Sequence, residues 1–347
     1  MTEPKNIAIV GAGMAGVACA RTLQQAGHQV TVFEKSSAPG GRMATRRTPF
    51  GSFDHGAQYF TVRDARFARA IATVPGLCKP WSANTVRVLD EHGRVAAASL
   101  PAREPHWVPV PGMNALVARW AQPLADRECL SLQTTVTRIE RDALDSKRWQ
   151  LRASGLLDSQ RVFSGFDAVL LAMPSVQTLH LLQSSAQASR LVQQLGKVQV
   201  APCWTLLLAY PQAMQPGLLS LGPQWNAARS THHRIAWLAR ESSKPGREPV
   251  ERWTVQASAA WSQEHLEDDA ERVQAKLLKA FAEVTGIRAE PSFATAHRWR
   301  YAQTTQALGA THLWDTTERI GACGDWCIGH RVEDAFISGL ELALTVA

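Results

Sequence analysis

The chain lacks any long hydrophobic run. Although 45% of its 347 residues are hydrophobic and 19% are charged, no stretch approaches the ~18 consecutive apolar residues of a membrane-spanning helix. The N-terminus MTEPKNIAIVGAG carries one early lysine and no small-residue cleavage site, which is not the pattern of a signal peptide. The sequence therefore predicts a cytoplasmic protein with no membrane partner.

Cysteine pairs and metal-ligand spacings are also missing. No CxxC occurs, and Cys323 with Cys327 has neither the interval nor the histidine partners of a zinc site. We predict no metal and reduced thiols, with a redox pair at Cys323 and Cys327 as the alternative. The six cysteines are Cys19, Cys78, Cys129, Cys203, Cys323 and Cys327.

Basic clusters are absent although the chain is basic overall. The formal net charge is +7 and the isoelectric point is near 9.3. Yet no block of five or more like charges occurs, and there is no zinc-finger spacing and no basic repeat flanked by aromatic residues. These absences argue against nucleic acid as a partner. A positive protein attracts small anions, so the charge is compatible with a phosphate-bearing substrate.

The first structural feature that the sequence predicts is a strand–helix–strand unit. The apolar run over 5–10, a helix pattern ending at Gly27 and a second apolar run over 29–35 form a βαβ opening. A further helix is predicted over 112–125. Strands are predicted over 130–140, 148–153 and 166–174.

Residues 179–304 have a different character, with six of the twelve tryptophans. The order indicates an α/β fold in which a nucleotide-binding domain made of separated segments carries an inserted α+β domain. Within 179–304 we predict helices over 184–196 and 267–285 and strands at WTLLLAY (204–210), RIAWLA (234–239) and RWTVQAS (252–258). We assign residues 1–72, 108–178 and 305–347 to the first domain and residues 73–107 and 179–304 to the second.

The turn after the first strand reads VGAGMAG. Gly11 allows the tight turn, Gly13 lets backbone approach a pyrophosphate, and Gly16 lets the helix pack on the sheet. Glu34 ends the second strand about twenty residues later, where an acid binds a ribose hydroxyl and disfavours a 2′-phosphate. Together these features predict a dinucleotide site, with a chance Gly-rich turn as the alternative.

The next loop favours FAD over NAD as the bound dinucleotide. GGRMATRR places Arg42 where a guanidinium can meet the pyrophosphate, whereas a plain NAD dehydrogenase would continue into another helix. Arg46 and Arg47 could meet phosphate or be solvated, and we favour solvation. A second GxGxxG fingerprint is missing, which disfavours a reductase or monooxygenase with a separate NADPH domain.

Three further motifs carry a family resemblance. GGR after the ribose acid, PGM at 111–113 and the closing GDW at 324–326 resemble the FAD-dependent amine oxidase superfamily. GGRMATRR, DHGAQYFTVRD, AHRWRYA and CGDWCIGHRVEDAFISG together resemble its bacterial renalase-like subgroup, over nearly the whole chain. The resemblance implies a Rossmann-like FAD-binding domain of the amine oxidase/p-hydroxybenzoate hydroxylase type, an inserted α+β substrate domain and non-covalent FAD.

The resemblance also assigns the cofactor residues. In such flavoproteins the terminal Gly-Asp contacts the ribityl-phosphate part of FAD, and the next helix points its positive end at the flavin's pyrimidine carbonyl. Asp325 would bind the ribityl or phosphate region, Val332 would supply N–H groups, and Arg331 would lie at the edge of flavin and substrate. The predicted FAD set is Gly11, Ala12, Gly13, Met14, Ala15, Gly16, Glu34, Lys35, Gly41, Arg42, Met43, Ala57, Gln58, Val136, Gly324, Asp325, Arg331, Val332 and Ala335.

The segment DHGAQYF lines the substrate face of the flavin in that family. Burial of Tyr59 and Phe60 in a core turn is the alternative, and each tryptophan also suits a core. His297 is assigned a structural role. The predicted substrate contacts are Gln58, Tyr59, Phe60, Thr61, Trp107, Trp204, Trp299, Tyr301 and Arg331.

The resemblance finally implies a reaction. Renalase-like proteins oxidise the 2- and 6-dihydro isomers of NAD(P)H to NAD(P)+ by hydride transfer to flavin N5, and O2 then reoxidises the flavin to give H2O2. The protein supplies position and electrostatics, so no catalytic side chain is assigned and no protein partner is indicated. One alternative is an oxidase of small amines, although neither an aromatic cage nor a lysine near N5 can be assigned. The other is a non-catalytic binding protein of the same fold.

Overall fold

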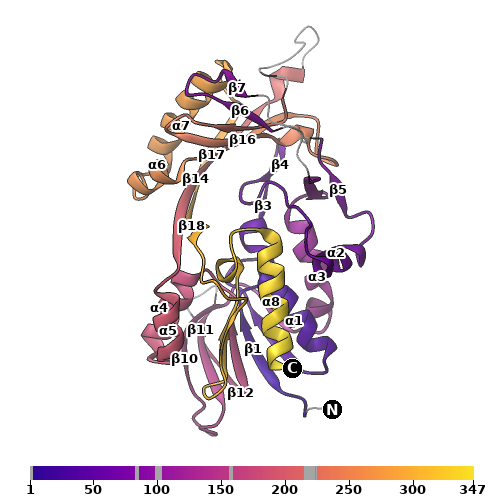
Figure 1. Ribbon diagram of the computed structural model, residues 1–347, viewed down its shortest axis with the longest axis vertical. Coiled ribbons are helices and arrows are strands. Elements are labelled where there is room, and N and C mark those ends of the chain that lie inside the picture. Colours follow the sequence, from indigo (N-terminus) through magenta and orange to yellow (C-terminus); the bar gives the residue numbers. More distant parts are fainter. Residues whose placement is uncertain (1–2, 83–85, 98–103, 156–158, 215–222, 224) are drawn as a thin grey trace.

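The computed structural model describes residues 3–82, 86–97, 104–155, 159–214, 223 and 225–347 (Figure 1). Within these ranges no helix combines the length and apolarity needed to cross a bilayer. The α-helices are Met14–Gln25 (α1), Ala65–Ala72 (α2), Asn114–Asp126 (α3), Ser175–Ser185 (α4), Ser189–Leu195 (α5), Ala259–Glu264 (α6), Ala270–Thr285 (α7) and Val332–Val346 (α8), and the short 3₁₀ turns are Gly41–Met43 (η1), Pro211–Met214 (η2), Glu241–Ser243 (η3) and Asp325–Cys327 (η4). The strands are Asn6–Val10 (β1), Gln29–Phe33 (β2), Thr45–Thr48 (β3), Gly51–Asp54 (β4), Cys78–Pro80 (β5), Arg87–Leu89 (β6), Val95–Ala97 (β7), Trp107–Pro109 (β8), Leu130–Ser131 (β9), Thr135–Arg141 (β10), Trp149–Ser154 (β11), Gln160–Phe166 (β12), Ala168–Leu171 (β13), Gln199–Tyr210 (β14), Ala227–Ser230 (β15), Ile235–Arg240 (β16), Glu251–Ala257 (β17), Phe293–Gln306 (β18), Leu313–Asp315 (β19) and Ile320–Ala322 (β20).

A six-stranded sheet, in the order β19-β20-β13-β1-β2-β9, forms the lower part of the molecule. β1 lies between β2 and β13 and is parallel to both. Its central residues are buried on both faces, which explains the continuous apolar run in the sequence. Ile7 and Ile9 face a core formed with α1, α3 and α8. Ala8 and Val10 face a second core formed with the three-stranded sheet β10-β11-β12 and with α4 and α5.

Helix α8 brings the end of the chain against its first helix. In Figure 1 the two helices lie side by side. A Cβ on Gly339 would lie 2.1 Å from the carbonyl oxygen of Ala15, so a glycine is required for this close approach. Segments from the two ends of the sequence therefore form one wall of the lower part.

A seven-stranded sheet, in the order β18-β14-β17-β16-β15-β6-β7, forms the upper part (Figure 1). Helices α6 and α7 cover its outer face, where Leu206 and Leu208 of β14 are buried. Helix α7 begins where the Asp269 carboxylate accepts a hydrogen bond from the backbone N–H of Arg272, and it ends at Gly286 with a φ of +75°.

The inner face of the seven-stranded sheet points toward β4 and the turn over residues 55–60. Side chains alternate along β18, as they do in any strand. Ala296 packs against the outer core, whereas Phe293 contacts Phe53 of β4, and His297 and Trp299 contact His55. This inner face carries Trp299, one of the predicted aromatic contacts.

The predicted α/β class with an added α+β unit is confirmed by these sheets. The helix predicted over 184–196 is wrong at its start, because α4 ends at Ser185 and α5 begins at Ser189. Ala186 and Ala188 have φ of +53° and +49°, and such left-handed residues break the helix. Strand β12 was not predicted. Strands β6 and β7 join the upper sheet, and the domain boundaries stay a prediction.

Candidate functional site

The N-terminus of α1 presents unprotected backbone amides. Gly13 is the N-cap of this helix, and no side chain caps its first turn. Gly11, at φ +108°, turns the chain off β1, and a Cβ there would lie 2.5 Å from the carbonyl oxygen of Ala172. A Cβ on Gly16 would lie 1.9 Å from the carbonyl oxygen of Gly11, whereas a Cβ on Gly13 would lie 3.9 Å from its nearest neighbour. The space beside Gly13 is open, and the helix dipole favours an anion in it.

The Gly13→Ala variant is expected to fold but to bind FAD at least about tenfold more weakly, because the new methyl group occupies only the space that a pyrophosphate needs. The Gly16→Ala variant is the contrast, because its methyl group collides with backbone and should lower the melting temperature instead. Circular dichroism and FAD titration distinguish the two. Equal FAD affinity in wild type and Gly13→Ala would contradict the assignment.

Glu34 lies at the carboxyl end of β2, as predicted, and is buried. Its Oε2 accepts a hydrogen bond from the backbone N–H of Ala12 at 2.8 Å, and its Oε1 accepts one from that of Ser36 at 2.9 Å. Each oxygen keeps a second lone pair for a ribose hydroxyl. The carboxylate thus joins the Gly-rich turn to the next loop, while Lys35 is exposed.

Arg42 and Asp325 form an ion pair that the sequence did not predict. The Arg42 guanidinium donates to both oxygens of the Asp325 carboxylate, with Nη1 at 3.0 Å from Oδ2. The same Nη1 donates to the carbonyl oxygen of Ala302 in β18 at 3.2 Å. Two predicted FAD residues, distant in sequence, therefore meet where η1, η4 and β18 converge. Asp325 is buried and Arg42 is half-buried.

Helix α8 begins at Arg331, its N-cap. The Asp334 carboxylate accepts hydrogen bonds from the backbone N–H groups of His330 and Arg331 at 3.0 and 2.9 Å. The Glu333 carboxylate accepts two from the backbone of Arg63 and Asp64, each at 2.7 Å. A cavity of about 330 Å³ at this helix start is lined by Arg63, Asp64, Ile328, Glu333, Asp334 and Ile337.

The turn over residues 55–60 lies directly on the Arg42 loop. The backbone N–H of Ala57 donates to the carbonyl oxygen of Arg42 at 2.9 Å, and a Cβ on Gly56 would lie 2.0 Å from that same oxygen. The Gln58 amide nitrogen donates to the carbonyl oxygens of Asp54 and Gly56. Gln58 is buried, so its side chain closes the turn, and its predicted contacts with FAD and substrate stay predictions.

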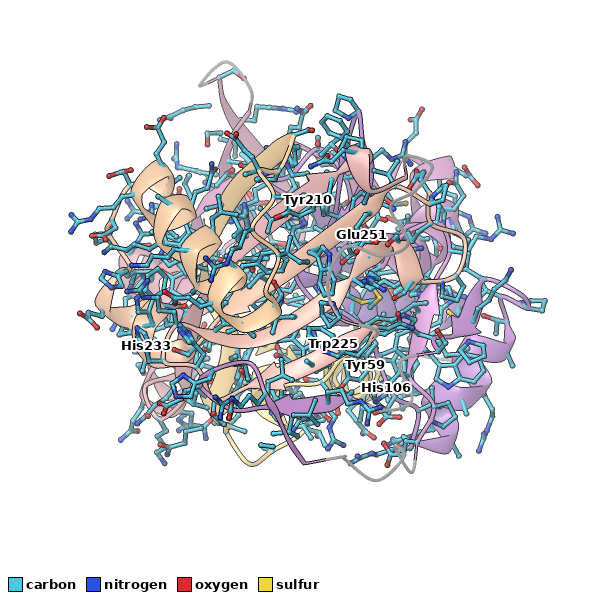
Figure 2. All side chains as sticks on the ribbon, turned by 90° about the horizontal axis from the view of Figure 1, so that it is seen from above. Tyr59, His106, Tyr210, Trp225, His233 and Glu251 are labelled. Carbon is cyan, nitrogen blue, oxygen red and sulfur yellow. The ribbon has the colours of Figure 1, made fainter. Side chains whose placement is uncertain are left out.

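The predicted aromatic residues divide into two groups. Tyr59, Trp107, Trp299 and Tyr301 are half-buried. The Tyr59 ring stacks on the His106 ring at 3.9 Å between centroids (Figure 2). The side chains of two other predicted contacts are buried in the core, and their substrate roles stay predictions. Phe60 packs against Phe67, and Trp204 is buried on the outer face with its indole N–H donating to the carbonyl oxygen of His265.

Two histidines, one overlooked and one discounted in the sequence, flank Trp299. The His55 ring stacks on Trp299 at 5.1 Å and meets the His297 ring edge-on at 4.7 Å. Burial lowers the pKa of His55 to about 4, and the charges of His297 and Arg46 act in the same direction. Burial, with the charge of Arg46, also lowers the pKa of His297. Both imidazoles are therefore neutral at pH 7.

The remaining predicted residues lie as follows. Met14, Ala15 and Met43 are buried near the Gly-rich turn, and Ala12 and Gly324 are also buried. Val332 and Ala335 are half-buried at the start of α8, Thr61 is half-buried and Gly41 is exposed. Val136 is half-buried on β10, against the core on the opposite side of the lower sheet from α1. The roles of these residues stay predictions.

Two protein families match consecutive segments of this chain. Residues 9–72 match the NAD(P)-binding Rossmann-like domain, and residues 97–347 match the flavin containing amine oxidoreductases. An L-amino-acid oxidase of Daboia russelii is 56% identical over 46 residues, which are 13% of this chain and 9% of that protein. The matched segment thus spans about a tenth of that curated relative.

Solved structures share the fold over the full length. Cyclohexylamine oxidase from Brevibacterium oxydans is 14% identical with a TM-score of 0.72, and the match covers 99% of each chain. A cofactor-binding redesign of putrescine oxidase is 15% identical with a TM-score of 0.74, and the match covers 100% of this chain and 99% of that one. At such identities the likeness shows the fold alone.

Proposed function

The chain belongs to the flavin containing amine oxidoreductase family, and we propose that within it the chain oxidises 2- and 6-dihydro isomers of NAD(P)H to NAD(P)+, with O2 as the final acceptor and H2O2 as the product. The cofactor is FAD, which supplies the two-electron redox chemistry when bound. The proposal is supported by the motif resemblance of residues 54–61, 297–302 and 321–339 and by the charge of the site.

The side chains present fit FAD. The uncapped amides of α1 and the open space at Gly13 suit a pyrophosphate. The Glu34 carboxylate suits the ribose of the adenosine part. Arg42 and Asp325 pair with each other and not with Glu34, and we assign them to the phosphate and ribityl parts. The first turn of α8, whose N-cap Arg331 N–H is already bound by Asp334, would then supply the N–H groups that follow, near Val332.

One observation carries the choice of substrate: the carboxylates around the site are engaged, while Arg46 and Arg331 are not buried. Asp54 binds two buried cations, and Glu333 and Asp334 bind backbone N–H groups. Arg46 is exposed beside the two neutral histidines, and Arg331 is half-buried. These two arginines can pair with the phosphates of an anionic dinucleotide, which the net charge of +7 attracts, whereas a protonated amine would find no partner in them.

The environment of the buried lysine also favours a dinucleotide substrate over an amine. Among the described residues Lys244 is the single buried lysine, and all three of its N–H donors are engaged by side-chain oxygens. It therefore has no donor left for a flavin atom. Hydride donation by a dihydropyridine leaves an aromatic pyridinium and needs no protein base, so the proposed reaction does not require a free lysine.

The test is an anaerobic titration of the purified flavoprotein, with the visible spectrum recorded as each donor is added. We expect rapid loss of flavin absorbance with 2- or 6-dihydro-NAD and none with ordinary NADH or with a panel of primary amines. Bleaching by amines alone would transfer the protein to the amine oxidase alternative. A loaded flavin that no donor reduces would favour the binding-protein alternative.

The Arg331→Ala variant is expected to keep its FAD but to be reduced roughly tenfold more slowly by the dihydro-NAD isomer, because the substrate loses a positioning cation. Stopped-flow reduction measures the rate, and the absorbance ratio at 280 and 450 nm measures FAD content. Arg152→Ala removes an exposed arginine on β11 and serves as the control. An unchanged reduction rate in Arg331→Ala would remove Arg331 from the substrate site.

A further inference from the structure

A buried ionic cluster lies beneath the turn over residues 55–60. The Lys244 ammonium donates to three oxygens: Asp54 Oδ2 at 3.1 Å, Glu241 Oε1 at 2.8 Å and Gln58 Oε1 at 3.2 Å. The side chains of Lys244, Asp54 and Glu241 have no exposed surface. An ammonium has three donors, so this set satisfies Lys244 completely.

Asp54 joins this cluster to the lower part of the molecule. Its Oδ1 accepts hydrogen bonds from the backbone N–H of Met113 at 2.8 Å and from the hydroxyl of Thr45 at 2.7 Å. Its Oδ2 accepts the bond from Lys244 and a second from Arg247 Nη2 at 2.7 Å. One carboxylate therefore holds β3, the start of α3 and the segment after η3 together.

The cluster is balanced in charge. Burial would raise the pKa of Asp54, but the charges of Lys244 and Arg247 outweigh burial and lower this pKa to about 2. Burial raises the pKa of Glu241, while Lys244 opposes that rise. Two acids thus face two cations, and removal of any one member leaves a buried net charge.

One of the three oxygen atoms that Lys244 binds, Gln58 Oε1, belongs to the turn itself. Gln58, the third partner, also donates to the carbonyl oxygen of Gly56 at 3.1 Å. Two residues of the upper sheet hold the same turn from above: Gln256 Nε2 donates to the carbonyl oxygen of Gly56 at 2.8 Å, and Trp299 Nε1 donates to that of His55 at 2.9 Å. The turn is therefore fixed from both sides.

Tyr59 lies in this turn, next to Gln58. Its ring lies 6.4 Å from that of Trp81, and the Lys244 ammonium lies 5.4 Å from the centroid of the Trp81 ring. Buried ion pairs are poor sources of stability, since apolar residues of similar size often replace them without loss. The cluster is therefore better understood as fixing the positions of neighbouring groups, and here those groups form the predicted substrate face.

We propose that Lys244 is a positioning residue that holds the 55–60 turn, and with it Tyr59, in the pose required for hydride transfer. The proposal deepens the proposed function and rests on it for the identity of the substrate. Lys244 acts through Gln58 and Asp54 and touches neither substrate nor cofactor. Nothing in the sequence around ESSKPGR, residues 241–247, signalled this role.

The test compares three variants of the FAD-loaded protein. Lys244→Met removes the cation and leaves one buried negative charge in excess. The double variant Glu241→Gln/Lys244→Met removes an acid as well and restores the balance without the three-way contact. Lys276→Met removes a half-buried lysine of α7 that pairs with Asp268, far along the chain from the turn, and is the matched control.

We expect Lys244→Met to retain FAD while the rate of flavin reduction by the dihydro-NAD isomer falls at least about tenfold, because small displacements of positioning groups cost that much. The double variant should recover the melting temperature but not the rate. Lys276→Met should match wild type in both. Rates within twofold of wild type in Lys244→Met or, if that variant does not fold, in the double variant would overturn the proposal.

A second readout does not depend on the substrate. Hydrogen–deuterium exchange of the holoprotein should show amides of residues 55–60 exchanging roughly fivefold faster or more in Lys244→Met and in the double variant, but not in Lys276→Met. Unchanged exchange of this segment in both variants would also overturn the proposal. If no dihydro-NAD isomer reduced wild type, the proposed function would fail, and the exchange result alone would decide the role of Lys244.

Discussion

An Asp325→Ala variant is expected to lose most of its FAD during purification, with an affinity lower by roughly 100-fold or more. Two effects combine. The variant loses the carboxylate that we assign to the ribityl or phosphate region, and it leaves the Arg42 guanidinium without its bidentate partner at 3.0 Å. Truncation of one member of a buried hydrogen-bonded charge pair typically costs about 2–5 kcal/mol, which corresponds to a factor of about 30 to several thousand.

FAD titration of the apoprotein, followed by flavin fluorescence, measures this affinity, and the absorbance ratio after gel filtration measures retention. Asp145→Ala, in an exposed turn of the lower part, is the matched control and should bind FAD as wild type does. The Arg42→Met variant provides a cross-check, since it should weaken FAD to a similar extent. Full FAD content in Asp325→Ala would refute the assignment of Asp325.

The sequence predicted the parts of the site that depend on local chain geometry. Gly11, Gly16 and Glu34 act within one βαβ unit, so their spacing alone fixes where they lie. The structure places them at the predicted strand end, and the carboxylate of Glu34 binds the turn that the glycines form. For a motif of this kind, the spacing of the residues in the sequence is enough to predict where they lie in the structure.

The contacts that the sequence could not predict are those between segments far apart in the chain. Arg42 was assigned to a pyrophosphate from its loop alone, yet its partner Asp325 and its acceptor Ala302 lie near the other end of the chain. The role of Lys244 could not be predicted from the sequence, because its partners Asp54 and Gln58 come from β4 and the turn that follows it. Only the packing of the two sheets brings these groups together.

The sequence could not show which aromatic side chains reach the site, and the reason is a different one. Composition cannot say which face of a strand a tryptophan occupies, and one residue of register moves a side chain to the opposite face. Trp299 of β18 lies on the inner face and contacts His55, whereas Trp204 of the neighbouring strand β14 lies on the outer face beneath α6. The strand around Trp204 was predicted, whereas β18 was not, and the registers of both strands came from the structure.

Asp54→Asn is expected to be the most destabilising of the single carboxylate changes, by about 3–5 kcal/mol, because it leaves one buried positive charge in excess. The asparagine Oδ1 can still accept the hydrogen bonds from Met113 and Thr45, whereas its Nδ2 cannot accept those of Lys244 and Arg247. The loss therefore reports the charge and the acceptor at Oδ2 and not the shape. Thermal unfolding by circular dichroism, with FAD in excess, should show a melting temperature lower by roughly 5–10 °C.

Asp64→Asn is the informative control, because the pKa of Asp64 is also lowered to about 2, chiefly by its hydrogen bond with Arg66. That pair is half-exposed, however, and surface ion pairs contribute only about 0–1 kcal/mol. Asparagine also replaces aspartate well at the N-cap of α2 that Asp64 forms. Equal melting temperatures for the two variants would show that burial of the ionic cluster does not decide its contribution.

The pH dependence of the same comparison has a defined sign. The pKa of Asp54 in the folded protein, about 2, lies below its ordinary value of 3.8. A carboxyl of this kind stabilises the folded state at every pH above the ordinary value, and that contribution is lost as the pH falls from about 4 toward about 2. The difference in unfolding free energy between wild type and Asp54→Asn should therefore be constant from pH 5 to pH 7 and shrink below pH 4. A difference that grew on acidification would mean that Asp54 is not ionised in the folded protein.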